Sequence, residues 1–192
     1  MQEIKEIIVK KTSVYHTSLS NMHLLESIYA YLESNRDKFT SRSWDCSVRT
    51  SLNITQNILY SEEEFKHLAN EIENIVKNLL YKNFARRTPF HIYESWINIY
   101  REHGYQESHT HRQGCGVGCL YLTEQNSDIE FIIFSEDIRT RITPKKGDIL
   151  FSDGGTWHRV LESKNERLSL AFNFVIEPAS HVPTDINIER GK

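Results

Sequence analysis

The sequence predicts an α+β fold, mainly β, in which N-terminal helices buttress a β-sandwich, jelly roll or barrel. Two observations carry this prediction: apolar residues recur at helical spacing in the first 90 residues, and short β-rich segments follow one another after residue 90. The chain has 192 residues, of which 39% are hydrophobic and 26% charged, as expected for one globular domain. We therefore expect a single domain over residues 1–192, with helical buttress and lid elements over 1–90, the β core over 91–178 and a polar tail over 179–192.

The first 90 residues begin with a short predicted strand at residues 7–9. A first helix is indicated by apolar residues at helical spacing: Leu24, Leu25, Ile28, Tyr29 and Leu32. A second helix has one apolar face: Phe65, Leu68, Ala69, Ile72, Ile75, Val76, Leu79 and Leu80. Ser61 and Glu64 form a capping-box pattern at its start. The polar and basic segments 36–50 and 82–91, which include Trp44, Arg86 and Arg87, are candidates for a lid over a binding site.

The second half consists of short segments typical of strands, separated by turn signals. These segments are residues 91–100, 116–122, 129–134, 139–142, 148–151, 157–162 and 167–176. Closely spaced short strands of this kind favour a sandwich, jelly roll or barrel.

Composition argues against several classes of protein. The formal net charge of −3 does not provide the broad positive field of a nucleic-acid binder, so nucleic acid is an unlikely partner. No apolar run approaches the roughly 20 residues of a membrane-spanning helix, so we expect no membrane partner. Cys46, Cys115 and Cys119 form no CxxC pair and leave an odd thiol, which fits a reducing compartment, and we expect the protein in the cytoplasm.

Three histidines suggest a metal site in the β half. Residues two apart in an extended chain share a face, so the imidazoles of His109 and His111 can point into one cavity. His158 follows a Gly-rich turn at a predicted strand start, from which it can approach the first pair from across a barrel. Three imidazoles on one side of a metal leave positions open for other ligands. Chance pairing among the nine histidines of the chain is the competing interpretation.

Arg167 raises the weight of the metal-site interpretation. It lies nine residues after His158, with a polar turn at residues 163–165 between them, so a hairpin would bring it beside His158 on the neighbouring strand. An arginine that points inward among apolar residues needs an anion, and a dicarboxylate would supply one. A surface arginine paired with Glu162 or Glu166 is the alternative.

Taken together, these elements resemble the iron(II)/2-oxoglutarate-dependent oxygenases. The resemblance covers about residues 92–176. Its elements, in chain order, are Trp96-Ile97-Asn98, His109-Thr110-His111, the strand of residues 116–122, Pro144-Lys145-Lys146-Gly147-Asp148, His158 and Arg167-Leu168-Ser169.

The resemblance implies a double-stranded β-helix, a jelly-roll or cupin-like barrel, and a set of cofactors. Fe(II) would be held by the histidines, with 2-oxoglutarate as cosubstrate and O2 as oxidant. Arg167 would bind the distal carboxylate of 2-oxoglutarate, because a guanidinium fork fits a carboxylate, and Ser169 would add a hydroxyl. Tyr100 and Asn98 are further candidate contacts of the cosubstrate. Hydroxylation of an unactivated C–H bond, with release of succinate and CO2, would be the default reaction on an unknown small-molecule or peptidyl substrate.

The third ligand departs from the family pattern, in which a carboxylate follows the first histidine by two residues. Either the site uses three histidines, which we favour, or a carboxylate such as Glu107 or Asp153 completes it. A cupin that ignores 2-oxoglutarate is a rival, although Cys115 and Gly116 stand where cupins carry a glutamate. A non-catalytic ligand-binding barrel is the other alternative.

Overall fold

The structure is a computed structural model that describes residues 5–9, 12–41, 46–84, 90–112, 114–124, 128–133 and 138–176. The N-terminal segment contains strands β1 (Lys5–Val9), β2 (Thr12–Ser18), β3 (Thr40–Ser41) and β4 (Val48–Thr50). Its helices are α1 (Leu25–Asn35), α2 (Ile58–Ser61) and α3 (Lys66–Phe84), with 3-10 turns η1 (Met22–Leu24), η2 (Arg36–Lys38), η3 (Ser51–Asn53) and η4 (Glu63–Phe65). The later strands are β5 (Phe90–Tyr100), β6 (Gln106–His109), β7 (Gly116–Tyr121), β8 (Ile129–Ile133), β9 (Ile138–Ile142), β10 (Asp148–Asp153), β11 (Trp157–Val160) and β12 (Arg167–Ile176).

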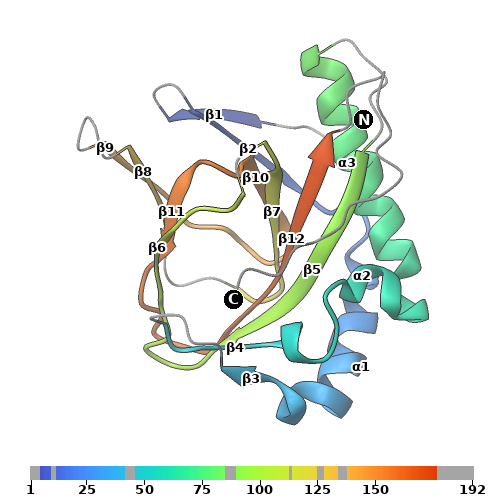
Figure 1. Ribbon diagram of the computed structural model, residues 1–192. Coiled ribbons are helices and arrows are strands. Elements are labelled where there is room, and N and C mark those ends of the chain that lie inside the picture. The colour runs from blue at the N-terminus through green and yellow to red at the C-terminus, as the bar shows by residue number, and fades with distance from the viewer. Residues whose placement is uncertain are drawn as a thin grey trace.

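These strands form two sheets that face each other (Figure 1). The larger sheet has the order β1-β2-β10-β7-β12-β5-β4-β3, and the smaller has the order β6-β11-β8-β9. All named ladders are antiparallel. From β5 to β12 the strands alternate between the two sheets, apart from β8 and β9, which are neighbours in the smaller sheet. The β half is therefore a double-stranded β-helix, and the predicted fold class is confirmed.

Strand alternation divides the larger sheet into a helix-covered face and an inner face. On β12, Leu168, Leu170, Phe172 and Phe174 pack into the main hydrophobic core with the helices. The intervening residues, which begin with Arg167, line an inner cavity. The helices lie against the outer face in Figure 1, and their burial there stabilises the sheet that carries one wall of the cavity.

The aromatic rings of Phe172 and Phe174 on β12 require glycine on the neighbouring strand β7. A Cβ placed on Gly118 would lie 2.2 Å from Cζ of Phe172, and one on Gly116 would lie 2.1 Å from Cζ of Phe174. Glycine at these two positions therefore lets the aromatic rings lie flat against the backbone of β7.

The N-terminal half confirms some local predictions and corrects others. The predicted apolar face of α3 is buried from Leu68 to Leu79, and η4 contributes Phe65 at its start. The capping box was wrong: Ser61 ends α2, and Glu62, which makes no side-chain cap, precedes η4. The first lid candidate, residues 36–50, belongs in part to the larger sheet, because β4 pairs with β5. Trp44, Arg86, Arg87 and the tail 179–192 lie outside the described residues.

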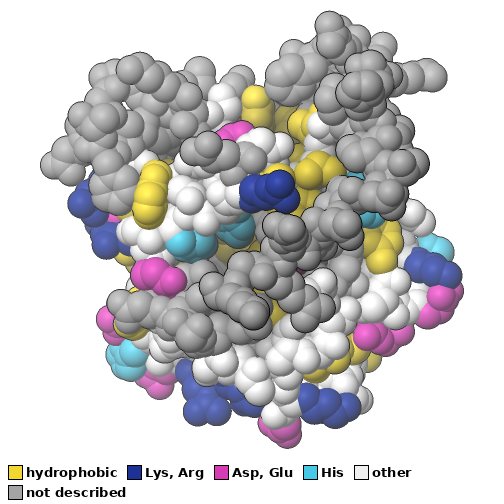
Figure 2. Space-filling model, in the orientation of Figure 1, with side chains coloured by type: hydrophobic (Ala, Val, Ile, Leu, Met, Phe, Trp, Pro, Cys, Tyr) yellow, Lys and Arg dark blue, Asp and Glu magenta, His cyan; other side chains and the backbone are white. Residues whose placement is uncertain are grey.

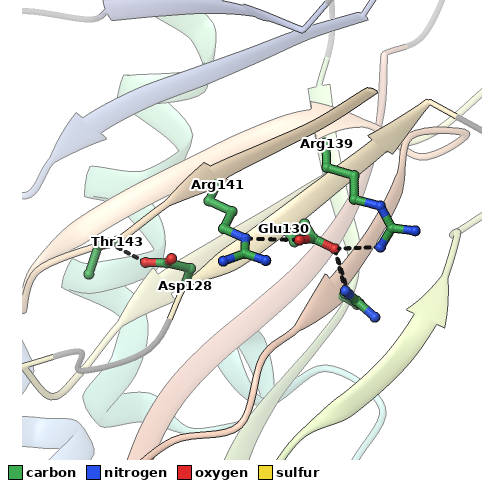
Figure 3. Close-up of polar contacts among 6 residues, drawn as sticks. Asp128, Glu130, Arg139, Arg141 and Thr143 are labelled. Atoms are coloured by element: carbon green, nitrogen blue, oxygen red, sulfur yellow. Dashed lines mark hydrogen bonds and ion pairs between the residues drawn. The ribbon is translucent and has the colours of Figure 1, made fainter. Parts of the chain in front are cut away.

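A buried carboxylate ties together three strands of the smaller sheet on its outer face. Glu130 of β8 has no exposed surface and pairs with Arg139 at 3.2 Å, Arg141 at 2.9 Å and Arg159 at 2.6 Å. Figure 3 shows the β9 arginines converging on Glu130. Burial alone would raise the pKa of Glu130, but the hydrogen bonds and charges of the arginines outweigh it and lower that pKa.

Among the described residues, no helix is long and apolar enough to cross a membrane. Cys46, Cys115 and Cys119 are free thiols.

Candidate metal and cosubstrate site

The three predicted histidines meet at one end of the smaller sheet. His109 is the last residue of β6, and His111 follows two residues later, where its N–H donates to the Gly154 carbonyl at 2.7 Å. β11 pairs with β6 so that His158 lies directly opposite His109. One ring nitrogen from each histidine lies within 4.8 Å of the other two. This separation is short enough for one metal ion to bind all three nitrogens.

Backbone carbonyls fix the orientation of two of these rings. Nδ1 of His109 lies 2.8 Å from the carbonyl oxygen of Glu107, and Nδ1 of His158 lies 2.9 Å from that of Thr156. A carbonyl can only accept, so Nδ1 carries the proton in both rings and Nε2 offers its lone pair. Each ring therefore presents the nitrogen that a metal would use.

The environment of His111 and His158 keeps both imidazole rings unprotonated, and so able to bind a metal ion, at neutral pH. Burial, with the nearby His109, lowers the pKa of His111 to about 4, although Asn173 beside it acts in the opposite direction. Burial and the other two histidines lower the pKa of His158 to about 3. Both rings are consequently neutral near pH 7, the form that binds a metal ion.

Neither alternative carboxylate joins the histidine group. Among the described residues, the group of side chains close enough together to share one metal ion contains these three histidines and neither Glu107 nor Asp153. Asp153 is exposed, and its Oδ1 accepts from the Gly155 N–H at 2.8 Å. Glu107 lines the same cavity, and its Oε2 is buried without a hydrogen-bond partner among the described residues.

A cavity of about 320 Å³ extends from the histidines along the inner face of the larger sheet. One wall consists of alternate residues of two paired strands: Glu94, Trp96, Asn98 and Tyr100 of β5, and Arg167, Ser169, Ala171 and Asn173 of β12. The register sets Arg167 opposite Tyr100 and Ser169 opposite Asn98. All four residues predicted to bind the cosubstrate therefore line one cavity with the three histidines. Figure 2 shows histidine side chains (cyan) near the middle of this molecular face.

Arg167 is a buried cation at one end of this cavity. Its side chain is 2% exposed, its guanidinium lies 4.4 Å from the centre of the Tyr100 ring, and its Nη1 donates to the Leu161 carbonyl at 3.4 Å. Burial lowers the pKa of Arg167, although the neighbouring Tyr100 and Tyr121 act against this effect. Arginine still remains protonated, so an anion bound at this end would offset the cost of burying the charge.

Tyr100 and Ser169 complete the surroundings of the guanidinium. The Tyr100 hydroxyl donates to Oε1 of Gln106 at 2.6 Å, and burial raises its pKa, so the phenol stays protonated. Ser169 lies beside Cys119, whose pKa burial raises to about 11. This end of the cavity thus combines one fixed positive charge with the hydroxyl groups of Tyr100 and Ser169, and the Glu107 carboxylate lies close enough to raise the pKa of Tyr100 further.

The structure corrects two expectations about strand pairing. The residues 163–165 do form a turn, but His158 and Arg167 are not on neighbouring strands, because β11 belongs to the smaller sheet and β12 to the larger. His158 also approaches His109 from the adjacent strand rather than from across the barrel. A short loop does not force a hairpin here because each strand finds its partners in a different sheet.

Sequence reasoning missed three further cavity residues: Glu94, Asn173 and, as more than a core residue, Trp96. The Trp96 ring stacks on His111 with centroids 6.2 Å apart. Alternation could have found the other two, since Asn173 shares a face with Arg167 and Ser169, and Glu94 shares a face with Trp96 and Asn98.

Comparison with known proteins gives a consistent result at the level of the fold. No protein-family model and no curated protein matches the sequence. A prolyl-4-hydroxylase of Pseudomonas putida superposes with a TM-score of 0.65 at 14% identity, over 86% of this chain and 93% of that chain. The α-ketoglutarate-dependent epimerase SnoN from nogalamycin biosynthesis gives 0.66 at 10% identity, over 92% and 88%.

A third similar structure was solved with ligands. HygX from Streptomyces hygroscopicus, with nickel and 2-oxoglutarate bound, gives a TM-score of 0.62 at 10% identity, over 86% of this chain and 83% of that chain. At such identities the likeness concerns the fold and not the activity. The chain has the double-stranded β-helix fold of the 2-oxoglutarate-dependent iron(II) oxygenases.

Proposed function

We propose that this protein is an iron(II)- and 2-oxoglutarate-dependent oxygenase. The observation that carries the proposal is the placement, in one cavity, of three metal-competent imidazoles and a buried arginine, on a fold shared with such enzymes. The nickel and 2-oxoglutarate bound to HygX support the same combination of cofactors.

His109, His111 and His158 would hold Fe(II), each through one ring nitrogen. Three protein ligands leave positions for the cosubstrate and O2. Arg167 would bind the distal carboxylate of 2-oxoglutarate, because its planar fork matches two carboxylate oxygens and its site is shielded from water. Ser169 and Asn98 would add hydrogen bonds, and Tyr100 would hold the guanidinium in place through its ring.

With these groups bound, iron supplies the oxidising chemistry: 2-oxoglutarate and O2 give succinate and CO2, and the second oxygen atom oxidises the substrate. We propose hydroxylation, in which that oxygen enters a C–H bond to give an alcohol, so that atoms balance without a further reductant. The chain's own contribution is to orient the cosubstrate between Arg167 and the histidines. The free thiols fit a reducing compartment, and we propose the cytoplasm.

Succinate formation tests this function directly. Purified protein is supplied with Fe(II), ascorbate and 2-oxoglutarate under air, and succinate is measured with and without candidate substrates. We expect turnover that is lost in His158→Ala and Arg167→Ala. His23→Ala and Arg36→Ala are matched controls, because both side chains reach solvent and form surface ion pairs with Glu26 and Glu166.

A second measurement covers the case in which turnover requires the true substrate. The metal-loaded protein is titrated with 2-oxoglutarate without oxygen, and binding is followed by the metal-to-ligand absorption band. Failure of the wild-type protein to bind 2-oxoglutarate would contradict the proposal. Metal binding alone would then favour a cupin-type enzyme, and failure to bind a metal would favour a non-catalytic barrel.

A further inference from the structure

We propose that the end of the cavity opposite Arg167 recognises a positively charged, N–H-bearing group of the substrate, such as an ammonium or guanidinium. Glu94 would be its counter-ion and Asn173 its hydrogen-bond acceptor. This inference rests on the proposed function, since it assigns the substrate class of the same cavity.

The position of these two residues follows from the register of β5 and β12. Asn173 lies opposite Glu94, six residues along β12 from Arg167. At about 3.3 Å per residue, the two ends of this wall are roughly 20 Å apart. A bulge at Tyr93, just before Glu94, interrupts the alternation of β5. Glu94 is therefore the first residue of β5, in chain order, that faces the cavity. Trp96 stacks on His111, which places this end next to the histidines.

The hydrogen bonds of this end leave acceptors for a ligand. Nδ2 of Asn173 donates to Oε2 of Glu94 at 2.8 Å, which holds both side chains in place. Asn173 is 6% exposed; its side chain lies beside His111, but its Oδ1 makes no well-aligned hydrogen bond among the described residues. A buried acceptor without a partner is costly, and a donor on a bound molecule would remove that cost.

Charge gives this end the opposite polarity to the Arg167 end. Glu94 is half-buried, and no ion pair links it to any described residue. The cavity therefore has the Arg167 cation at one end and the Glu94 carboxylate at the other, with the histidines along its length; Glu107 is a second carboxylate of the lining and lies nearer Tyr100. The first end fits the carboxylate of 2-oxoglutarate, and the second fits a cation. Trp96 is 7% exposed and its Nε1–H, likewise without a partner in the described structure, would donate to an oxygen atom of the same substrate.

Binding of simple probes tests this assignment without turnover. Ligand-observed NMR at low ionic strength compares n-butylammonium, n-butanol and n-butyrate on the full-length protein free of metal and 2-oxoglutarate. We expect n-butylammonium to bind at least about tenfold more tightly than n-butanol, the factor typical of one hydrogen bond to a charged group. Glu94→Gln should abolish this preference while keeping the contact with Asn173.

Two further variants make the result specific. Glu166→Gln, which removes an exposed carboxylate outside the cavity, should leave the preference unchanged. Glu94→Lys should bind n-butyrate more tightly than the wild-type protein does through Arg167, a gain of binding that an unfolded variant cannot show. Equal binding of n-butylammonium and n-butanol, no binding of either, or an unchanged preference in Glu94→Gln would overturn the inference.

The succinate assay separates this inference from the proposed function. Succinate formation without an ammonium preference would overturn the substrate class and leave the oxygenase intact. An ammonium preference that Glu94→Gln removes, in a protein that neither binds nor turns over 2-oxoglutarate, would support the cation subsite and overturn the oxygenase.

Discussion

Replacing Glu130 by glutamine should destabilise the protein by about 2 kcal/mol at pH 7. The carboxylate is fully buried beneath three arginines whose side chains are 44%, 59% and 33% exposed. A single exposed ion pair contributes up to about 1 kcal/mol and breaking a fully buried one costs about 3–5 kcal/mol. The arginines can turn to water after the substitution, so three contacts at roughly 0.5–1 kcal/mol each give the expected value.

The pH dependence of this effect has a definite sign. The pKa of Glu130 is lower in the folded protein than its usual value of 4.5, so the carboxylate stabilises the fold above that pH. Its contribution is lost as pH falls below 4.5 through the folded pKa, because the protonated side chain resembles glutamine. The difference between wild type and Glu130→Gln should therefore shrink between pH 7 and pH 3.

Urea denaturation at pH 7, 4.5 and 3 measures both predictions. At pH 7 a loss of 2 kcal/mol corresponds to a fall in Tm of about 4–8 °C for a chain of this size. Glu166→Gln, which removes an exposed ion pair with Arg36, serves as the control and should cost less than about 0.5 kcal/mol. Equal stability of Glu130→Gln and wild type at pH 7, or a difference that widens in acid, would refute the reasoning.

Three further predictions concern the core and the site. Gly118→Ala should destabilise the fold by about 1–3 kcal/mol, because the new Cβ would lie 2.2 Å from the Phe172 ring; a urea midpoint equal to that of wild type would contradict this. Arg167→Lys keeps the charge but loses the fork over Tyr100, so we expect the KM for 2-oxoglutarate in the succinate assay to rise at least about tenfold, and an unchanged KM would exclude Arg167 as the carboxylate ligand. His158→Ala should lose tight iron binding, measured as metal retained after dialysis, whereas retention equal to that of wild type would show that His158 is not a ligand.

Sequence patterns indicated which residues gather in the candidate site. They were less successful at predicting which strands pair to bring those residues together. Alternation and turn signals located the β segments, and the spacing of His109, His111 and His158 indicated one metal site. Pairing was harder, because β6, β11 and β12 pair with strands that are not their neighbours in the sequence. Local spacing could not reveal that β11 pairs with β6, or that Arg167 lies opposite Tyr100.

In the N-terminal half, too, sequence patterns predicted local structure but not long-range strand pairing. The apolar face of α3 was readable because helical periodicity is a local property. β2 and β4 were missed, because the place of both strands is set by the β10 and β5 edges that they join. Asn173 was missed for another reason. A single asparagine among apolar residues matches no motif, and its hydrogen-bond partner in the cavity, Glu94, is 79 residues away in the sequence.

The two sheets allow ligand selectivity to change separately from metal chemistry. The rings of His109 and His158 are oriented by carbonyls of their own segments, so no neighbouring side chain has to be retained to aim them. The other polar contacts proposed here lie on the paired strands β5 and β12. A library that randomises other cavity-facing positions of those two strands, while Arg167 and the Trp96 and Asn173 side chains beside His111 are kept, should therefore yield variants with new substrate preferences that still take up iron.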